Sequence, residues 1–113
     1  MAAFTVKTRS GPQVRRERFG ELTDALDHLR ATVQNLADGA HGRTLSPPLM
    51  RDFEPVQQVH GRIELSGPGL RAGVDVRGDG SSEAFTGRLR KRLVEQLPGE
   101  DAVDALRRTL RER

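Results

Sequence analysis

The chain has 113 residues, which is the usual length of one domain, and it contains no cysteine. Disulfides, thiolate metal sites and a cysteine nucleophile are therefore excluded. The 19 basic and 16 acidic residues give a formal net charge of +3, and because nearly all of the basic residues are arginine and alternate with acids, the chain predicts a mixed, well-solvated surface.

The N-terminal segment, residues 1–7, has no basic region followed by an apolar run and a cleavage site of small residues. It therefore does not resemble a secretory signal. No apolar stretch has the length needed to cross a bilayer. We expect a single domain over residues 1–113, located in the cytoplasm, with no membrane contact.

The first predicted hairpin joins residues 4–9 to residues 14–19 through a turn at 10–13. Simple pairing places Phe4 opposite Phe19, but it also places Val6 opposite Glu17. The return strand carries too much charge to alternate cleanly between apolar and polar residues. We therefore expect either a bulge or an exposed edge strand.

A first helix is predicted from about Glu21 to Ala37. Apolar residues recur along it at steps of three and four, which gives one apolar stripe. The stripe comprises Leu22, Leu26, Leu29, Val33 and Leu36. Gly39 suits the C-terminal stop of this helix.

A long connection over residues 38–58 follows. Within it, residues 46–48 (Ser-Pro-Pro) resemble a helix start, with Leu49, Met50 and Phe53 on one side. Two interpretations stay open for these apolar side chains. They pack against the domain's own core, or they form an apolar patch for a partner.

The second predicted hairpin is the clearest element, because residues 59–65 and 70–76 both alternate between apolar and polar. Folding about the turn at 66–69 places all the apolar pairs on one face, among them Leu65 with Leu70 and Ile63 with Ala72. On the other face, Glu64 then lies opposite Arg71 and His60 opposite Asp75.

Two more helices are predicted beyond this hairpin. One covers about 81–97, with Phe85, Leu89, Leu93 and Leu97 along its apolar side. The other covers 101–111, with Val103, Leu106 and Leu110 facing inward. The sequence thus predicts an α+β domain of two β-hairpin-plus-helix units (ββα-ββαα), with a four-stranded antiparallel sheet and helices on one face. The shared order suggests an internal repeat of residues 3–37 and 59–97.

No cofactor or metal site is expected. Residues 77–79 (Arg-Gly-Asp) fit a turn, and the glycines near residues 67–73 join two strands instead of opening a helix, as a dinucleotide site requires. The calcium-loop pattern beginning at Asp75 has Arg77 where an oxygen ligand is needed.

We expect a non-enzymatic binding or assembly module that acts through protein contacts, including contacts between copies of itself as a homo-oligomer. Its expected partner-binding residues are Leu49, Met50, Phe53, Arg62, Glu64, Arg71 and Asp75. One alternative is nucleic-acid binding by a C-terminal stripe of basic residues, namely Arg88, Lys91, Arg92, Arg107, Arg108 and Arg111. The other is a small enzyme that uses His60 and Asp75 for acid–base chemistry.

Overall fold

A computed structural model describes residues 3–44, 59–87 and 90–111 of the chain. Six strands and two helices lie in this part. In chain order they are β1 (Phe4–Ser10), β2 (Gln13–Phe19), α1 (Leu22–Thr44), β3 (Val59–Gly67), β4 (Leu70–Arg77), β5 (Ser82–Thr86), β6 (Arg92–Leu93) and α2 (Ala102–Arg111).

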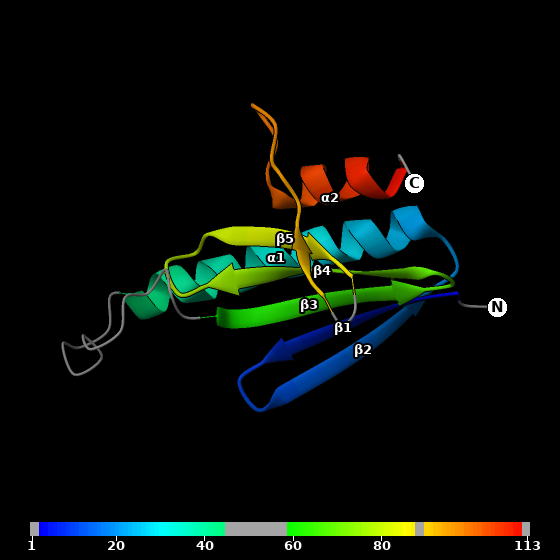
Figure 1. Ribbon diagram of the computed structural model, residues 1–113. Coiled ribbons are helices and arrows are strands. Elements are labelled where there is room, and N and C mark those ends of the chain that lie inside the picture. Colours follow the sequence, from blue (N-terminus) through cyan, green and yellow to red (C-terminus); the bar gives the residue numbers. More distant parts are fainter. Residues whose placement is uncertain (1–2, 45–58, 88–89, 112–113) are drawn as a thin grey trace.

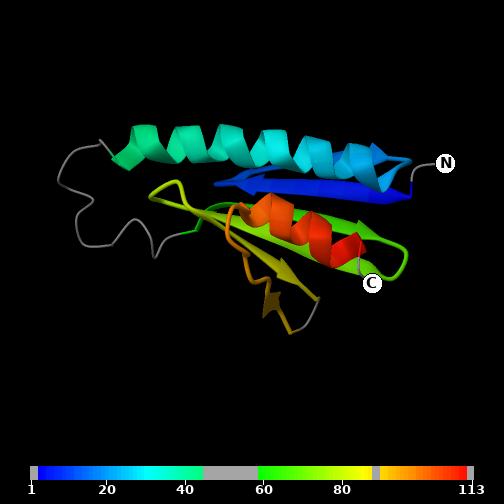
Figure 2. The ribbon, with the colours of Figure 1, turned by 90° about the horizontal axis from the view of Figure 1, so that it is seen from above.

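The strands form one antiparallel sheet in the order β2-β1-β3-β4-β5-β6. Helix α1 packs on β1, β3 and β4, and α2 packs on β4 and β5 beside α1. Figure 1 and Figure 2 show α1 behind the sheet and α2 along its β5 side. The predicted α+β class and antiparallel sheet are confirmed, but the number of strands is wrong, because the described part has six and not four.

The first hairpin has the predicted pairing, with Phe4 opposite Phe19 and Val6 opposite Glu17. Gly11 has φ +58° at the first central position of the turn, as a two-residue type II′ turn requires. Either a bulge or an exposed edge strand was expected here, and the structure shows the exposed edge strand. Every residue of β2 except Phe19 is exposed.

The second hairpin sorts its side chains as predicted, but its register differs by two residues. Gly67 lies opposite Leu70 and Leu65 opposite Ala72. The turn consists of Pro68 and Gly69 alone, because proline followed by a glycine at φ +66° forms a tight type II turn. Since side chains alternate with a period of two, this shift keeps the apolar residues on the same face.

The predicted helix over 81–97 is wrong. This segment forms β5 and β6, and the expected apolar stripe is broken: Leu93 and Leu97 are exposed, and Leu89 lies outside the described residues. In β5, Ala84 is buried toward the helices, whereas Phe85 lies on the opposite face. Pairing with the free edge of β4 makes residues 82–86 a strand, although the apolar residues of the segment have helical spacing.

Helix α1 continues to Thr44 and so passes Gly39, where the sequence predicted its end. The connection predicted over 38–58 therefore starts later. The apolar residues Leu49, Met50 and Phe53 lie outside the described residues, and their two interpretations stay open. The two halves of the proposed repeat share a hairpin, but only the first continues directly into a helix.

The core fills the space between the sheet and both helices. Its fully buried side chains include Leu29 of α1, Ile63 of β3, Val74 of β4 and Leu106 of α2. The C-terminal helix predicted over 101–111 is confirmed. Asp101 precedes α2 and accepts a hydrogen bond from the Asp104 amide at 2.7 Å, and Asp104 accepts one from the Asp101 amide at 3.2 Å. This reciprocal pair satisfies amides that the first turn leaves without helical partners.

Candidate functional site

The sheet face away from the helices, here called the outer face, carries most of the exposed charge of the strands. The strand registers place Arg16, Lys7, Glu64, Gly73 and Phe85 side by side in one row that crosses five strands. Residues directly opposite in an antiparallel pair project to the same face. Five strands thus contribute to one continuous surface.

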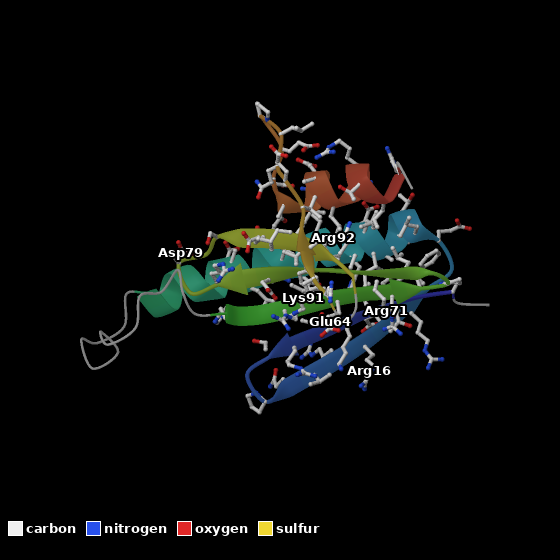
Figure 3. All side chains as sticks on the ribbon, viewed as in Figure 1. Arg16, Glu64, Arg71, Asp79, Lys91 and Arg92 are labelled. Atoms are coloured by element: carbon white, nitrogen blue, oxygen red, sulfur yellow. The ribbon has the colours of Figure 1, made fainter. Side chains whose placement is uncertain are left out.

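A pocket of about 430 Å³ lies on this outer face. Five cationic side chains line it together with one carboxylate, that of Glu64. They are Arg62 and a group of four that we call the pocket cations: Lys7, Arg16, Arg71 and Lys91. Figure 3 shows Arg16, Arg71 and Lys91 grouped around Glu64, far from Asp79 at the β4–β5 turn. The pocket cations come from β1, β2, β4 and the position just before β6, so the fold assembles the group from distant parts of the chain.

Phe85 closes the base of the pocket. Phe85 as a residue is 4% exposed, and its ring lies over Gly73, where a Cβ atom would stand 2.5 Å from the ring. The ammonium group of Lys91 lies 4.6 Å from the ring centroid, and the guanidinium carbon of Arg62 lies at 5.6 Å. Both cations face a ring that attracts positive charge, which favours their placement at the pocket.

Two other arginines on the outer face are ion-paired. Arg62 Nε donates to Asp75 Oδ1 at 2.5 Å and Arg62 Nη2 donates to Oδ2 at 3.2 Å. The hydrogen bonds from Arg62 to Asp75 raise the pKa of the Arg62 guanidinium. Arg77 pairs with Glu83 at 2.8 Å.

The four pocket cations differ from these arginines. Within the part of the chain that the structure describes, no ion pair joins Lys7, Arg16, Arg71 or Lys91 to a carboxylate. The pocket therefore has an excess of positive charge that no ion pair among the described residues compensates, and an anionic ligand would be attracted to it.

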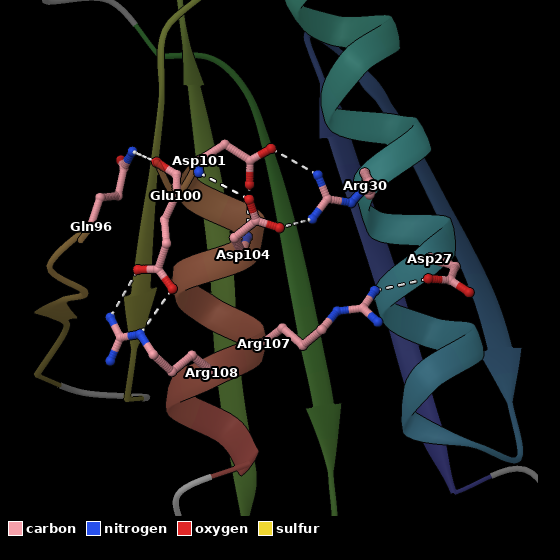
Figure 4. Close-up of polar contacts among 8 residues, drawn as sticks. All are labelled: Asp27, Arg30, Gln96, Glu100, Asp101, Asp104, Arg107 and Arg108. Atoms are coloured by element: carbon pink, nitrogen blue, oxygen red, sulfur yellow. Dashed lines mark hydrogen bonds and ion pairs between the residues drawn. The ribbon is translucent and has the colours of Figure 1, made fainter. Parts of the chain in front are cut away.

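The arginines of α2 are in a different situation. Arg108 Nε lies 3.0 Å from Glu100 Oε2, and Arg107 Nη2 lies 2.8 Å from Asp27 Oδ1 on α1 (Figure 4). The hydrogen bond from Arg108, followed by that from the Leu97 amide, lowers the pKa of Glu100. These two arginines hold α2 to its neighbours, so much of their charge is already compensated.

The structure thus divides the two predicted sets of site residues. It brings Arg62, Glu64, Arg71 and Asp75 together on the outer face, whereas Leu49, Met50 and Phe53 lie outside the described residues. Among the C-terminal basic residues, Arg88 also lies outside them. Lys91 precedes β6, Arg92 lies in it, and Arg107, Arg108 and Arg111 lie on α2. Lys91 faces the outer pocket, and α2 packs on the other face of the sheet.

The predicted pairing of His60 with Asp75 is wrong. Asp75 lies opposite Arg62 and binds it, because the register is shifted and β3 is irregular between Val59 and Gly61. A Cβ atom at Gly39 of α1 would stand 3.6 Å from His60 Nε2, so the imidazole reaches the helix side of the sheet. The acid–base pair that the enzyme alternative requires is not formed.

Sequence reasoning placed Phe85 in the core and did not place Lys7 or Arg16 in a site. Residues 82–86 do not alternate, because Ala84 and Phe85 are adjacent apolar residues that are both buried, so no period-two signal indicated the position of Phe85. No sequence signal joined Lys7 and Arg16 to Arg71, because their proximity depends on the order of the strands.

Within the described residues, neither helix combines the length and the apolar character that a bilayer crossing requires. No group of three potential metal ligands occurs among the same residues. No protein-family model, curated protein or solved structure matches the chain significantly.

Proposed function

We propose that the protein is a non-enzymatic binding module that recognises an acidic segment of a protein partner through the outer face of its sheet. The observation that carries the proposal is the group of four cations around the pocket: Lys7, Arg16, Arg71 and Lys91. They gather at a concave surface, where charges of one sign concentrate oppositely charged ligands.

A protein partner fits this surface better than a nucleic acid does. Single-stranded nucleic acids are held by exposed aromatic rings on which bases stack, and here Phe85 is buried beneath cations. Exposed apolar side chains, Val14 and Leu93, belong to the outer strands β2 and β6 and would suit contact with a polypeptide.

The proposal concerns a partner other than the protein itself at this surface. Two copies joined symmetrically through the outer face would bring their pocket cations together, and like charges in an interface disfavour association. Assembly as a homo-oligomer through another surface stays a prediction. Light scattering over a concentration series measures it.

Fluorescence anisotropy with a labelled ten-residue peptide of alternating glutamate and threonine tests the proposal. We expect the peptide to bind at low ionic strength and to dissociate as salt is added, because salt screens exposed charges beyond about 10 Å at 0.1 M. A peptide with lysine in place of glutamate controls for non-specific adhesion and should not bind.

Variants locate the binding. Arg71→Glu and Lys91→Glu should each weaken peptide binding by about tenfold, as removal of a well-placed complementary charge does. Arg111→Glu makes the same charge change on α2, at an exposed position, and should leave the affinity nearly unchanged. Equal loss in all three variants would show that net charge alone attracts the peptide and would contradict the proposal.

Nucleic-acid binding is the alternative outcome of the same experiment. A labelled 20-base-pair DNA duplex and an RNA of the same length are titrated at the same ionic strengths. The proposal expects the acidic peptide to bind more tightly than either. Tighter binding of a duplex, reduced by Arg107→Glu and Arg111→Glu, would favour the C-terminal basic residues instead.

A further inference from the structure

Strand β2 is an open edge of the sheet. It pairs on one side with β1, and among the described residues no strand lies on its other side. An edge strand presents backbone amide and carbonyl groups that can pair with an added strand. Figure 1 shows β2 at the border of the sheet, beyond the region covered by α1.

The charges of β2 select which strand can be added. Arg15, Arg16 and Arg18 stand against the single carboxylate Glu17, and all four are exposed. Two copies of β2 side by side would place these arginines next to one another, which destabilises pairing between like strands. The edge is thus protected against its own copies but is complementary to an acidic segment.

We propose that the acidic partner binds by adding an extended strand to β2. This inference rests on the proposed function and specifies how the partner is held. The partner's backbone pairs with the free side of β2, and its carboxylates lie beside Arg16 and Arg18 on the outer face. Arg16 also lines the pocket, so the added strand is continuous with the four-cation surface.

The turn fixes which backbone groups of β2 are free. Its two residues, Gly11 and Pro12, leave Ser10 and Gln13 as the closing pair, which in a hairpin of this type is hydrogen-bonded. Along a strand, the backbone amide and carbonyl groups of successive residues point alternately toward one neighbouring strand and away from it. The amides of Gln13 and Arg15 therefore point toward β1, and that of Val14 points away from it.

Val14 provides a test that leaves every charge in place. Val14→Pro removes the outward amide, and proline is tolerated where an edge strand faces solvent. Val14→Ala keeps the amide and is the matched control, since the side chain is 44% exposed. Circular dichroism and the thermal midpoint verify that both variants fold, and anisotropy with the glutamate–threonine peptide measures affinity.

The inference predicts that Val14→Pro weakens binding by about tenfold, whereas Val14→Ala changes it less than twofold. Hydrogen exchange gives the second measurement: the peptide should slow exchange at the Val14 and Arg16 amides of the unsubstituted protein. Unchanged affinity in Val14→Pro together with unchanged exchange would overturn strand addition and leave the outer-face proposal intact. Absence of any peptide binding would overturn both.

Discussion

The two faces of the sheet are formed by the same strands, but one face is covered by helices and the other is open. The inner face is closed, since α1 and α2 bury Ile63, Val74 and Leu106 completely. The outer face stays open, and it carries the four pocket cations, which have no ion pair within the described part of the chain. Arginine occurs in both regions. On α2, arginines form ion pairs with neighbouring segments, and on the outer face, arginines line the pocket.

The comparison shows that arginine content alone does not locate a binding surface. The C-terminal segment 107–113 has four arginines in seven residues, yet Arg107 and Arg108 are ion-paired there. On the outer face, the strand order brings cations that are far apart in the chain to one pocket.

The largest effect on stability should come from the closed face. Leu106→Ala removes a fully buried side chain from the layer between α2 and the sheet. We expect the free energy of unfolding to fall by about 2 to 5 kcal/mol, since such truncations leave a cavity. Chemical denaturation measures the change. A loss below about 0.5 kcal/mol would show that α2 does not complete the core.

A smaller effect is expected at the base of the outer pocket. A Cβ atom at Gly73 would stand 2.5 Å from the Phe85 ring and 2.6 Å from the Ile63 carbonyl oxygen. Gly73→Ala should therefore cost about 1 to 3 kcal/mol, the usual range for overpacking. Adding Phe85→Leu should recover only part of this loss, because the carbonyl contact remains. Full stability of Gly73→Ala would contradict the position of the ring over the backbone.

Acid should weaken the ion pair between Arg108 of α2 and Glu100. Arg108 lowers the pKa of Glu100 below its ordinary 4.5 in the folded protein. Its contribution to stability is therefore present above about pH 4.5 and is lost as the pH falls through the folded pKa, because the unfolded chain takes up the proton first. Glu100→Gln should flatten the fall in stability below pH 4.5, and Arg108→Gln should do the same. Thermal midpoints between pH 3 and pH 7, about one unit apart, measure this; an unchanged slope in both variants would contradict it.

The smallest effect on stability is expected for the pocket cations. Arg71→Glu alters an exposed side chain that has no ion pair within the described part of the chain. Its free energy of unfolding should stay within about 0.5 kcal/mol of the unsubstituted protein, as for most surface changes. Denaturation of Arg71→Glu beside Arg111→Glu provides the comparison. A large loss would mean that Arg71 serves the fold and not a ligand.

Local pattern predicted much of the fold. The alternation around residues 59–76 gave the hairpin and its inner face, and the apolar spacing of 101–111 gave α2. The helix predicted over 81–97 failed because Phe85, Leu89, Leu93 and Leu97 have helical spacing, while pairing with β4 makes 82–86 a strand. Propensity is weak evidence where a neighbouring strand offers hydrogen bonds.

The candidate site was predictable only in part. Arg62, Glu64, Arg71 and Asp75 follow from the alternation of one hairpin, and the sequence placed them on the outer face correctly. Lys7 and Lys91 belong to the same site through the strand order β1-β3-β4-β5-β6. Long-range pairing of this kind leaves no trace in local periodicity.

The most direct test of the central claim is a titration of the isotope-labelled protein with the glutamate–threonine peptide, followed by backbone amide chemical shifts. The account predicts shifts at Lys7, Arg16, Arg71 and Lys91 that saturate together, with little change along α2. Shifts confined to α2, or no saturable shifts at low ionic strength, would contradict the assignment of the outer face as the binding surface.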